Sequence, residues 1–289
     1  MITLTRRSVL QSVAVGAAGS FASARASVFE QAAESKVRGN IPQSACKWCY
    51  DRKLSLEELA AGAARIGLKS IELIGPEDFA VVKKHGLTCA MTWGTGPIPD
   101  CLNRVENHDR CEAELRKNID FAAEAGIPSV ICFSGNRKGM PDDEGLENCA
   151  IGLKRVMGYA EKKGINVAME LLNSKVNHKD YMCDKTPWGV RLVDKVASPR
   201  FKLLYDIYHM QIMEGDVIRT IRQYKDYIVH YHTGGNPGRN EIDETQELNY
   251  TAICKAILDT GYKGYVGQEF VPTRDPLTSL GQAFRICDV

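Results

Sequence analysis

Four short apolar runs in the second half of the chain each end in a side chain that can bind a metal ion. These side chains are Glu170, Asp206, His232 and Glu269. Neighbouring members of the set are 36, 26 and 37 residues apart, and each interval is about the length of one strand plus the helix that follows it. Because the carboxyl ends of strands in a parallel barrel meet at one rim, the sequence predicts that the four side chains converge there.

The chemistry of this set favours a metal site over four separate structural roles. A single acidic residue at a strand end usually caps a helix or pairs with a base. Three carboxylates buried together without a cation would each cost several kcal/mol in desolvation and repulsion. We therefore predict one divalent metal ion bound by all four residues. The oxygen-rich set favours Mn²⁺ or Mg²⁺, with Co²⁺ or Zn²⁺ as alternatives.

Three further side chains are predicted to contact a substrate at the same rim. His209 follows Asp206 by three residues and either hydrogen-bonds a substrate oxygen or caps a helix. Arg239 lies in a Gly-rich loop, 234–241, where a guanidinium can hold a carboxylate. Trp93 follows a predicted strand and either walls the pocket or packs in the core or at the rim.

Glu72 and His230 are predicted to lie behind the metal ligands. Glu72 ends a predicted strand of its own. His230 points the same way as His232, because side chains repeat every two residues along a strand. We expect Glu72 to support the ligand set, and His230 to support it or to pack in the interior.

Eight apolar runs alternate with amphipathic stretches, and this order predicts eight strand–helix units. The predicted strands are 45–49, 70–73, 87–92, 129–133, 166–170, 202–206, 228–232 and 265–269. Helical patterns lie between them, for example at 55–66, 109–125, 146–163 and 250–260. Because parallel strands need crossover helices, the pattern predicts an α/β fold, a single (β/α)8 TIM barrel. A doubly wound open sheet would carry a Gly-rich first strand–helix turn, and residues 49–53 contain no glycine.

Residues 1–26 read as a cleavable export signal that precedes the barrel domain at 27–289. The paired Arg6 and Arg7 are followed by a short Ala/Gly/Val stretch and a run of small residues. The arginine pair predicts the twin-arginine pathway and a periplasmic location; a disordered basic tail is the alternative. The apolar stretch is shorter than the ~20 residues that a membrane span needs, so no stable membrane insertion is expected.

Charge and cysteine content narrow the classes of partner. Without the signal, 34 of the 37 basic residues remain against 36 acidic ones, which disfavours nucleic acid and membrane surfaces. The ten cysteines lie mostly in apolar segments, for example Cys89, Cys132 and Cys254, and are expected as free core residues. The Cys46–Cys49 pair has metal or redox spacing without a second pair. We expect a small-molecule substrate and leave the oligomeric state open, with a homo-oligomer among the alternatives.

The chain resembles the xylose-isomerase-like TIM-barrel superfamily of sugar isomerases and epimerases, and most of all its hydroxypyruvate isomerase branch. The resemblance covers the chain after the signal and is strongest between residues 169 and 272. Its most specific segments are ELLN at 170–173, YDIYHMQIMEGD at 205–216, PGRNE at 237–241 and GYKGYVGQEF at 261–270. His232 is a departure, because hydroxypyruvate isomerases often carry glutamine there and ketose 3-epimerases carry histidine.

The resemblance implies a function and roles for the rim residues. It implies an isomerase that converts hydroxypyruvate to tartronate semialdehyde through an enediolate, with Glu170 and Glu269 both binding metal and moving the proton. It also implies that Asp206 and His232 complete the coordination. A ketose 3-epimerase or another sugar isomerase is the alternative enzyme, and an exported sugar- or metal-binding barrel is the non-enzymatic one. A metal-dependent endonuclease on the same fold is disfavoured by the slightly acidic charge.

Overall fold

The computed structural model describes residues 37–289, of which Gly39–Val289 form one compact unit. The predicted export signal at 1–26 and the first ten residues of the predicted domain lie outside the described part of the chain. Within residues 37–289, no helix is both long enough and apolar enough to cross a membrane.

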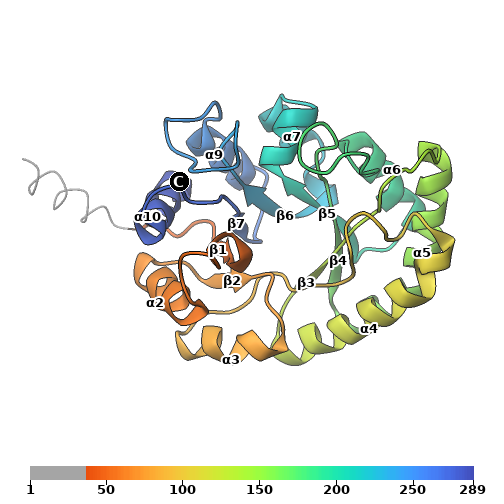
Figure 1. Ribbon diagram of the computed structural model, residues 1–289, viewed down its shortest axis with the longest axis horizontal. Coiled ribbons are helices and arrows are strands. Elements are labelled where there is room, and N and C mark those ends of the chain that lie inside the picture. The colour runs from red at the N-terminus through yellow and green to blue at the C-terminus, as the bar shows by residue number, and fades with distance from the viewer. Residues whose placement is uncertain (1–36) are drawn as a thin grey trace, which may run out of the picture. The chain divides into compact units, whose positions relative to one another are not determined.

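Seven parallel strands form one curled sheet, as Figure 1 shows. Their order across the sheet is β2-β1-β7-β6-β5-β4-β3. The strands are β1 (Gln43–Cys46), β2 (Ser70–Glu72), β3 (Ser129–Cys132), β4 (Asn166–Glu170), β5 (Phe201–Asp206), β6 (Ile228–Thr233) and β7 (Val266–Gln268). Apart from the pairing of β1 with β7, neighbours in the sheet are neighbours in the chain. This is a TIM-barrel-like α/β fold, as the alternation of strands and helices predicts.

The predicted strand at 87–92 is wrong as a regular strand, although the segment lies between the two edge strands. It makes isolated parallel bridges from Thr88 to Ser70 and from Thr92 to Val130. The Thr92 N–H donates to Ser129 O at 3.1 Å, and the Ile71 N–H donates to Thr88 O at 3.1 Å. In between, the N–H of Ala90 donates to the Ser70 hydroxyl at 2.7 Å. A side chain therefore takes the place of a backbone carbonyl there and interrupts the ladder.

The first predicted strand, 45–49, is also wrong at its end. Pairing of β1 with β2 stops at Cys46 opposite Glu72. The next three residues, Lys47–Cys49, form a 3-10 turn. The chain therefore leaves the sheet before Trp48, and the Trp48 side chain lies at the carboxyl end of the sheet, where it contacts Glu269.

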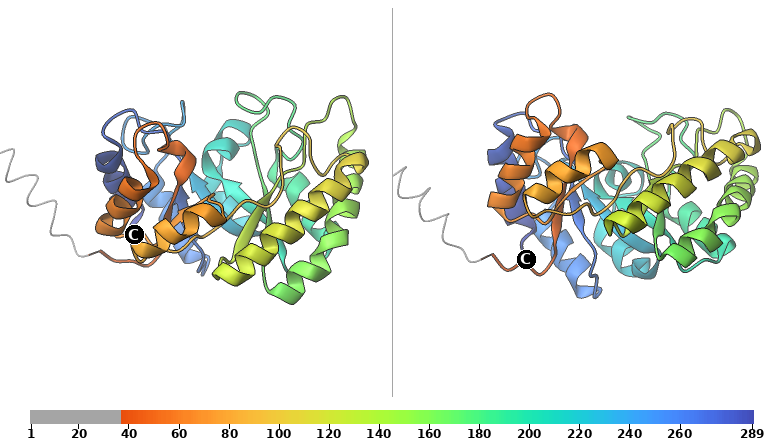
Figure 2. Two further views of the ribbon diagram at one scale, coloured as in Figure 1. Left: turned by 60° about the horizontal axis from the view of Figure 1, so that its bottom comes forward. Right: turned by 90° about the horizontal axis from the view of Figure 1, so that it is seen from below.

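Helices follow the strands and lie outside the sheet (Figure 1). They are α2 (Leu56–Ile66), α3 (Pro76–Lys84), α4 (His108–Ala125), α5 (Asp142–Lys163), α6 (Thr186–Val196), α7 (Ile207–Met213), α8 (Val217–Gln223), α9 (Tyr250–Asp259) and α10 (Pro276–Cys287). Figure 2 shows α4 and α5 running side by side, and these helices pack on β3 and β4. The packing explains the apolar stripes that the sequence shows in both helices.

Local signals in the sequence set several helix ends. Ser55 and Glu58 form the predicted capping box at the start of α2. Gly126 and Gly164 end α4 and α5 with left-handed φ values of 72° and 74°, which other residues adopt at a cost. All ten cysteines are buried and free, so the expectation of free core thiols is confirmed.

Candidate metal centre and active site

The four predicted ligands meet at the carboxyl ends of four neighbouring strands. Glu170 ends β4, Asp206 ends β5, His232 lies in β6, and Glu269 follows β7 directly. Asp206 pairs in register with His232. One ligand atom from each of the four lies within 4.8 Å of those of the others, and all four side chains are buried. The convergence that the strand ends predict is therefore what the fold builds.

Two contacts of the imidazole tie this cluster together. His232 Nδ1 lies 2.8 Å from Glu269 Oε2 and 3.7 Å from Glu170 Oε1. Neither contact has hydrogen-bond geometry, and within the described residues this buried nitrogen makes no hydrogen bond. An imidazole nitrogen that faces two carboxylates without bonding either is placed as a metal ligand would be. The donor set and this orphaned atom fit one divalent cation.

Arg239 lies inside the same cluster. Its Nη2 donates to Glu269 Oε2 at 2.6 Å and to Asp206 Oδ2 at 3.0 Å. Its backbone has a left-handed φ of 59°. The positive charge of the guanidinium thus lies beside two of the four predicted metal ligands. That Arg239 binds a substrate carboxylate stays a prediction.

The two glutamates have opposite electrostatic environments. Burial raises the pKa of Glu170, and the charge of Glu269 adds to that rise. Burial acts upward on Glu269 as well, but Arg239 and His232 hold the pKa of Glu269 well below its usual value. Paired carboxyl groups whose environments push their pKa values apart are typical of acid–base sites. Burial also raises the pKa of Asp206 well above its usual value, against the effect of Arg239.

Behind His232, Glu72 holds the other side of its ring. Glu72 Oε1 lies 2.6 Å from His232 Nε2 and 2.9 Å from His230 Nε2, and the Glu72 side chain is fully buried. Burial opposes the charge, but the two imidazoles hold the pKa of Glu72 well below its usual value. A carboxylate that accepts from one ring nitrogen fixes the other nitrogen for coordination. Glu72 and His230 therefore lie behind the ligands, where the sequence predicts them.

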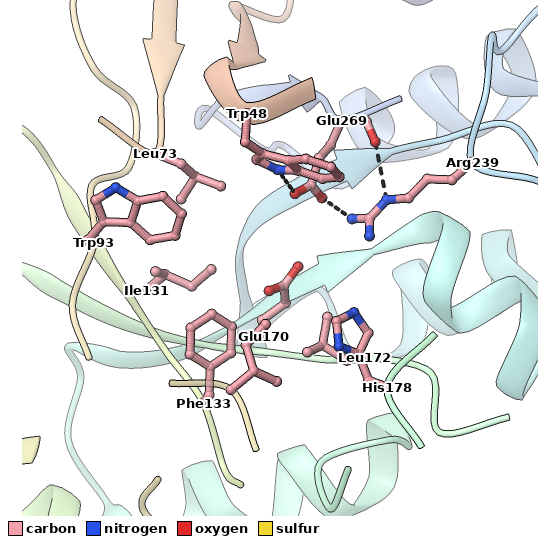
Figure 3. A pocket seen from close by; sticks show the side chains of 11 residues that line it. Trp48, Leu73, Trp93, Ile131, Phe133, Glu170, Leu172, His178, Arg239 and Glu269 are labelled. Atoms are coloured by element: carbon pink, nitrogen blue, oxygen red, sulfur yellow. Dashed lines mark hydrogen bonds and ion pairs between the residues drawn. The ribbon is translucent and has the colours of Figure 1, made fainter. Parts of the chain in front are cut away.

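A cavity of about 270 Å³ opens onto Glu170 and Glu269, and we call it the first cavity (Figure 3). Trp48, His178 and Arg239 border the same side. The rest of the lining is apolar. Leu73, Trp93, Ile131 and Phe133 lie across the cavity from these groups in Figure 3, and Ile98 and Leu172 also line it. Trp93 thus lies in the wall, as one of its two predicted roles requires.

Apart from Trp93, the sequence prediction missed the apolar lining of the first cavity and two side chains with polar groups, Trp48 and His178. Trp48 donates its Nε1–H to Glu269 Oε1 at 2.8 Å. His178 comes from the loop after β4 and packs edge-on against His209, with ring centroids 5.3 Å apart. The aromatic in the CKWCY segment was a signal for Trp48. His178 had no signal, because its loop has no periodic pattern to place it.

His209 is fully buried and does not line the first cavity. Its Nδ1 accepts from the Asn173 amide, which leaves the proton on Nε2, 3.5 Å from Asp206 Oδ2. Burial, followed by the charge of Arg239, keeps the pKa of His209 well below its usual value, so the ring is neutral. Its backbone N–H donates to Asp206 Oδ1 at 3.1 Å. His209 therefore contacts Asp206, one of the four predicted metal ligands, and its contact with a substrate stays a prediction.

The comparisons place this chain in a family. Residues 61–286 match the family described as xylose isomerase-like TIM barrel, so the chain belongs to that family. The hydroxypyruvate isomerase of Escherichia coli (strain K12) is 30% identical over 230 residues, which cover 73% of this chain and 85% of that protein. A putative hydroxypyruvate isomerase of Xenopus laevis is 34% identical over 178 residues, or 60% of this chain. The chain spans 65% of the Xenopus protein and 62% of its human counterpart.

Solved structures share the fold. An AP endonuclease of family 2 from Brucella melitensis superposes with a TM-score of 0.75 at 24% identity, over 83% of this chain and 97% of that one. A D-allulose 3-epimerase from Methylomonas sp., solved in complex with D-allulose, has a TM-score of 0.66 at 22% identity, over 85% and 90%. At these identities, the likeness concerns the barrel and not the reaction.

Proposed function

We propose that this protein is a metal-dependent isomerase that acts on a small hydroxy-carbonyl compound through an enediolate. The observation that carries the proposal is the meeting of Glu170 and Glu269 at the first cavity, within a donor set suited to a divalent ion. The family and the relatives named hydroxypyruvate isomerase support the reaction class. The particular reaction that we propose is conversion of hydroxypyruvate to tartronate semialdehyde.

The chemistry is proton transfer at a carbon next to a carbonyl. Such a C–H group is a weak acid, and its removal leaves negative charge on the neighbouring oxygens. A bound divalent cation would supply Lewis-acid stabilisation of that charge. Glu170 and Glu269 both face the first cavity, so one removes the proton and the same group or the other returns it to the adjacent carbon. General acid–base catalysis of this kind contributes roughly 10²–10⁴-fold.

The surrounding side chains keep these groups in position. Trp48 and Arg239 each donate to a different oxygen of Glu269, which fixes the plane of its carboxylate. Glu170 receives no such pair of donors, and its carboxylate points into the first cavity in Figure 3. The apolar wall opposite limits access of water, which strengthens electrostatic interactions inside the cavity.

A ketose 3-epimerase is the second candidate, and the lining of the first cavity favours it. Among the described residues that line this cavity, Arg239 is the one arginine or lysine, and the carboxylates of Asp206 and Glu269 already bind it. A neutral ketose needs no further cation, whereas a keto acid would need Arg239 or the metal to take its carboxylate. The same two glutamates serve both reactions, because the position of the substrate decides which carbon loses its proton.

Hydrogen exchange with solvent tests the reaction class and locates the reacting carbon. Purified protein with Mn²⁺ is incubated in D2O with hydroxypyruvate and, separately, with a panel of ketoses; metal and protein are removed before NMR. We expect deuterium at a single carbon of one substrate class. Exchange at C3 of a ketose would select the epimerase, and no exchange with any compound would contradict the isomerase.

Two controls separate catalysis from simple binding. Glu170→Gln and Glu269→Gln should each lower turnover by at least about 10²-fold while the circular dichroism spectrum stays that of a folded barrel. Removal of the metal with a chelator should abolish turnover, and added Mn²⁺ should restore it. A protein that gains thermal stability with sugar and metal, yet forms no product, is instead the non-enzymatic binding barrel.

A further inference from the structure

A second cavity adjoins the first one and is larger. Its volume is about 460 Å³, against about 270 Å³ for the first. It lies between the segment 93–98 and the face of α4 that carries Arg110, Glu114 and Asn118. Trp93, Ile98 and Phe133 line both cavities, so the apolar wall opposite the glutamates continues into the second one.

The two charged side chains that line the second cavity, Arg110 and Glu114, are paired with each other and with neighbouring backbone and hydroxyl groups. Arg110 Nη1 lies 3.1 Å from Glu114 Oε2, and Arg110 Nη2 donates to Asp100 O at 2.6 Å. Glu114 in turn accepts from the Thr95 hydroxyl at 2.7 Å and from the Gly96 N–H at 3.2 Å. These bonds hold the 93–98 segment against α4 and leave no unpaired charge in the lining to attract an anion. The second cavity therefore suits a neutral group.

Its surface has the mixed character that carbohydrates prefer. Trp93 is 43% exposed and lines the second cavity together with the apolar Ile98 and Phe133, so its indole can stack on the C–H face of a sugar ring. Asn118, together with the Arg110–Glu114 pair, offers polar atoms for hydroxyl groups at the border.

The combined size exceeds what a three-carbon acid fills. Pockets that bury an organic ligand usually measure about 300–1,000 Å³. The first cavity alone lies just under that range, and both together lie well inside it. Hydroxypyruvate would occupy a small part of this space and would leave the apolar wall uncovered.

We propose that the substrate is a glycosylated ketose. Its reacting ketose unit lies in the first cavity beside Glu170 and Glu269, and a second, neutral sugar ring lies in the second cavity against Trp93. The inference rests on the proposed function, since the same glutamates carry out the proton transfer. It takes the neutral ketose, the second candidate above, in place of hydroxypyruvate, and adds a second sugar ring whose glycosidic bond lies away from the reacting carbons.

Fructose and two disaccharides that carry the same glucosyl ring on different oxygens of fructose test this assignment. Isomaltulose carries a glucosyl group on O6 of fructose, so its first three carbons are free, whereas turanose carries the same group on O3. With Mn²⁺ in D2O, we expect kcat/KM for deuterium incorporation into isomaltulose to exceed that into fructose at least tenfold. Turanose, whose second ring blocks a reacting carbon, should be slower than both. A kcat/KM for isomaltulose equal to or below that for fructose would overturn the proposal.

Paired substitutions at Asn118 show whether the second cavity is responsible. Its Nδ2 donates to Gly94 O at 2.8 Å, and both Asn118→Ala and Asn118→Trp remove that hydrogen bond. Only the tryptophan fills the cavity. We expect the isomaltulose-to-fructose ratio of kcat/KM to fall at least tenfold in Asn118→Trp relative to Asn118→Ala, and equal ratios would contradict the assignment.

The failure of this inference is distinguishable from the failure of the proposed function. If fructose exchanges deuterium and isomaltulose has no advantage, the function stands and the second cavity has no part in it. If neither sugar exchanges, the isomerase proposal fails. Titration calorimetry then tests the sugar-binding role of the second cavity without any need for turnover. Isomaltulose should bind at least tenfold more tightly to Asn118→Ala than to Asn118→Trp, and equal affinities would show that the second cavity does not bind the second ring.

Discussion

Replacing Glu72 with glutamine should weaken metal binding, although Glu72 is not one of the four predicted ligands. Its Oε1 accepts from His230 and from His232, at 2.9 and 2.6 Å, in a fully buried environment. The negative charge keeps a proton on His232 Nε2 and so leaves Nδ1, on the ligand side, free to coordinate. Glutamine is nearly the same size but neutral, so its oxygen would accept from the two imidazoles without the help of a negative charge.

The structure sets the size of the expected effect. Both imidazoles bond the same oxygen, Glu72 Oε1, so the amide oxygen in Glu72→Gln can keep both partners, but the two bonds lose their charge assistance, which costs about 1 kcal/mol each. The weaker bonds hold the His232 ring less firmly in the orientation that coordination needs, so part of this free energy is lost from metal binding. Mutation of a residue that supports a metal-bound histidine typically weakens metal affinity by about 10–100-fold. We expect a rise in the Mn²⁺ dissociation constant of that order.

Titration of metal-depleted protein with Mn²⁺, followed by electron paramagnetic resonance, measures the affinity without any need for activity. Glu241→Gln is the matched control, because Glu241 is a buried carboxylate bonded to Thr273, Ser279 and Arg274 rather than to any of the four ligands. Calorimetric unfolding verifies that both variants are folded. If Glu72→Gln and the control bind Mn²⁺ within threefold of each other, Glu72 does not orient the ligand.

Three other predictions concern stability and export. Arg239→Ala leaves buried carboxylates without their cation, so the metal-depleted variant should lose about 3–5 kcal/mol of unfolding free energy. Added Mn²⁺ should restore most of this free energy, and an equal loss with and without Mn²⁺ would contradict the prediction. Hydrogen bonds from backbone N–H groups and from the Ser279 and Thr273 hydroxyls outweigh burial and lower the pKa of Glu241 to about 2 from its ordinary 4.5. Because the pKa is lower in the folded state, ionised Glu241 adds roughly 3 kcal/mol at most to the free energy of unfolding above about pH 5, and this contribution is lost as pH falls toward 2. Urea titrations should therefore show a smaller loss of unfolding free energy between pH 5 and pH 2 for Glu241→Gln than for the unchanged protein. We propose export by the twin-arginine route, so changing Arg6 and Arg7 to lysine should retain the protein in the cytoplasm in a fractionation assay, and unchanged periplasmic recovery would refute it.

The sequence by itself determined the alternation of strands and helices and the ends where chemistry occurs. Apolar runs and capping residues are local features, so β4, β5 and β6 and the start of α2 could be placed from the residues alone. The meeting of Glu170, Asp206, His232 and Glu269 also followed, because parallel strands in one curled sheet bring their carboxyl ends together.

Only the tertiary structure decided which side chains complete the site. Trp48 and His178 come from segments without a periodic pattern, and no such pattern gives the direction of a side chain there. Arg239 was predicted at the rim, but its contacts with Asp206 and Glu269 were not. The same holds for the interrupted strand at 87–92, where the Ser70 hydroxyl replaces a backbone partner. The two adjoining cavities arise because residues distant in the chain, such as Leu73, Trp93 and Phe133, fail to fill the space between them. Such packing depends on the three-dimensional shape of many side chains at once, which local sequence does not encode.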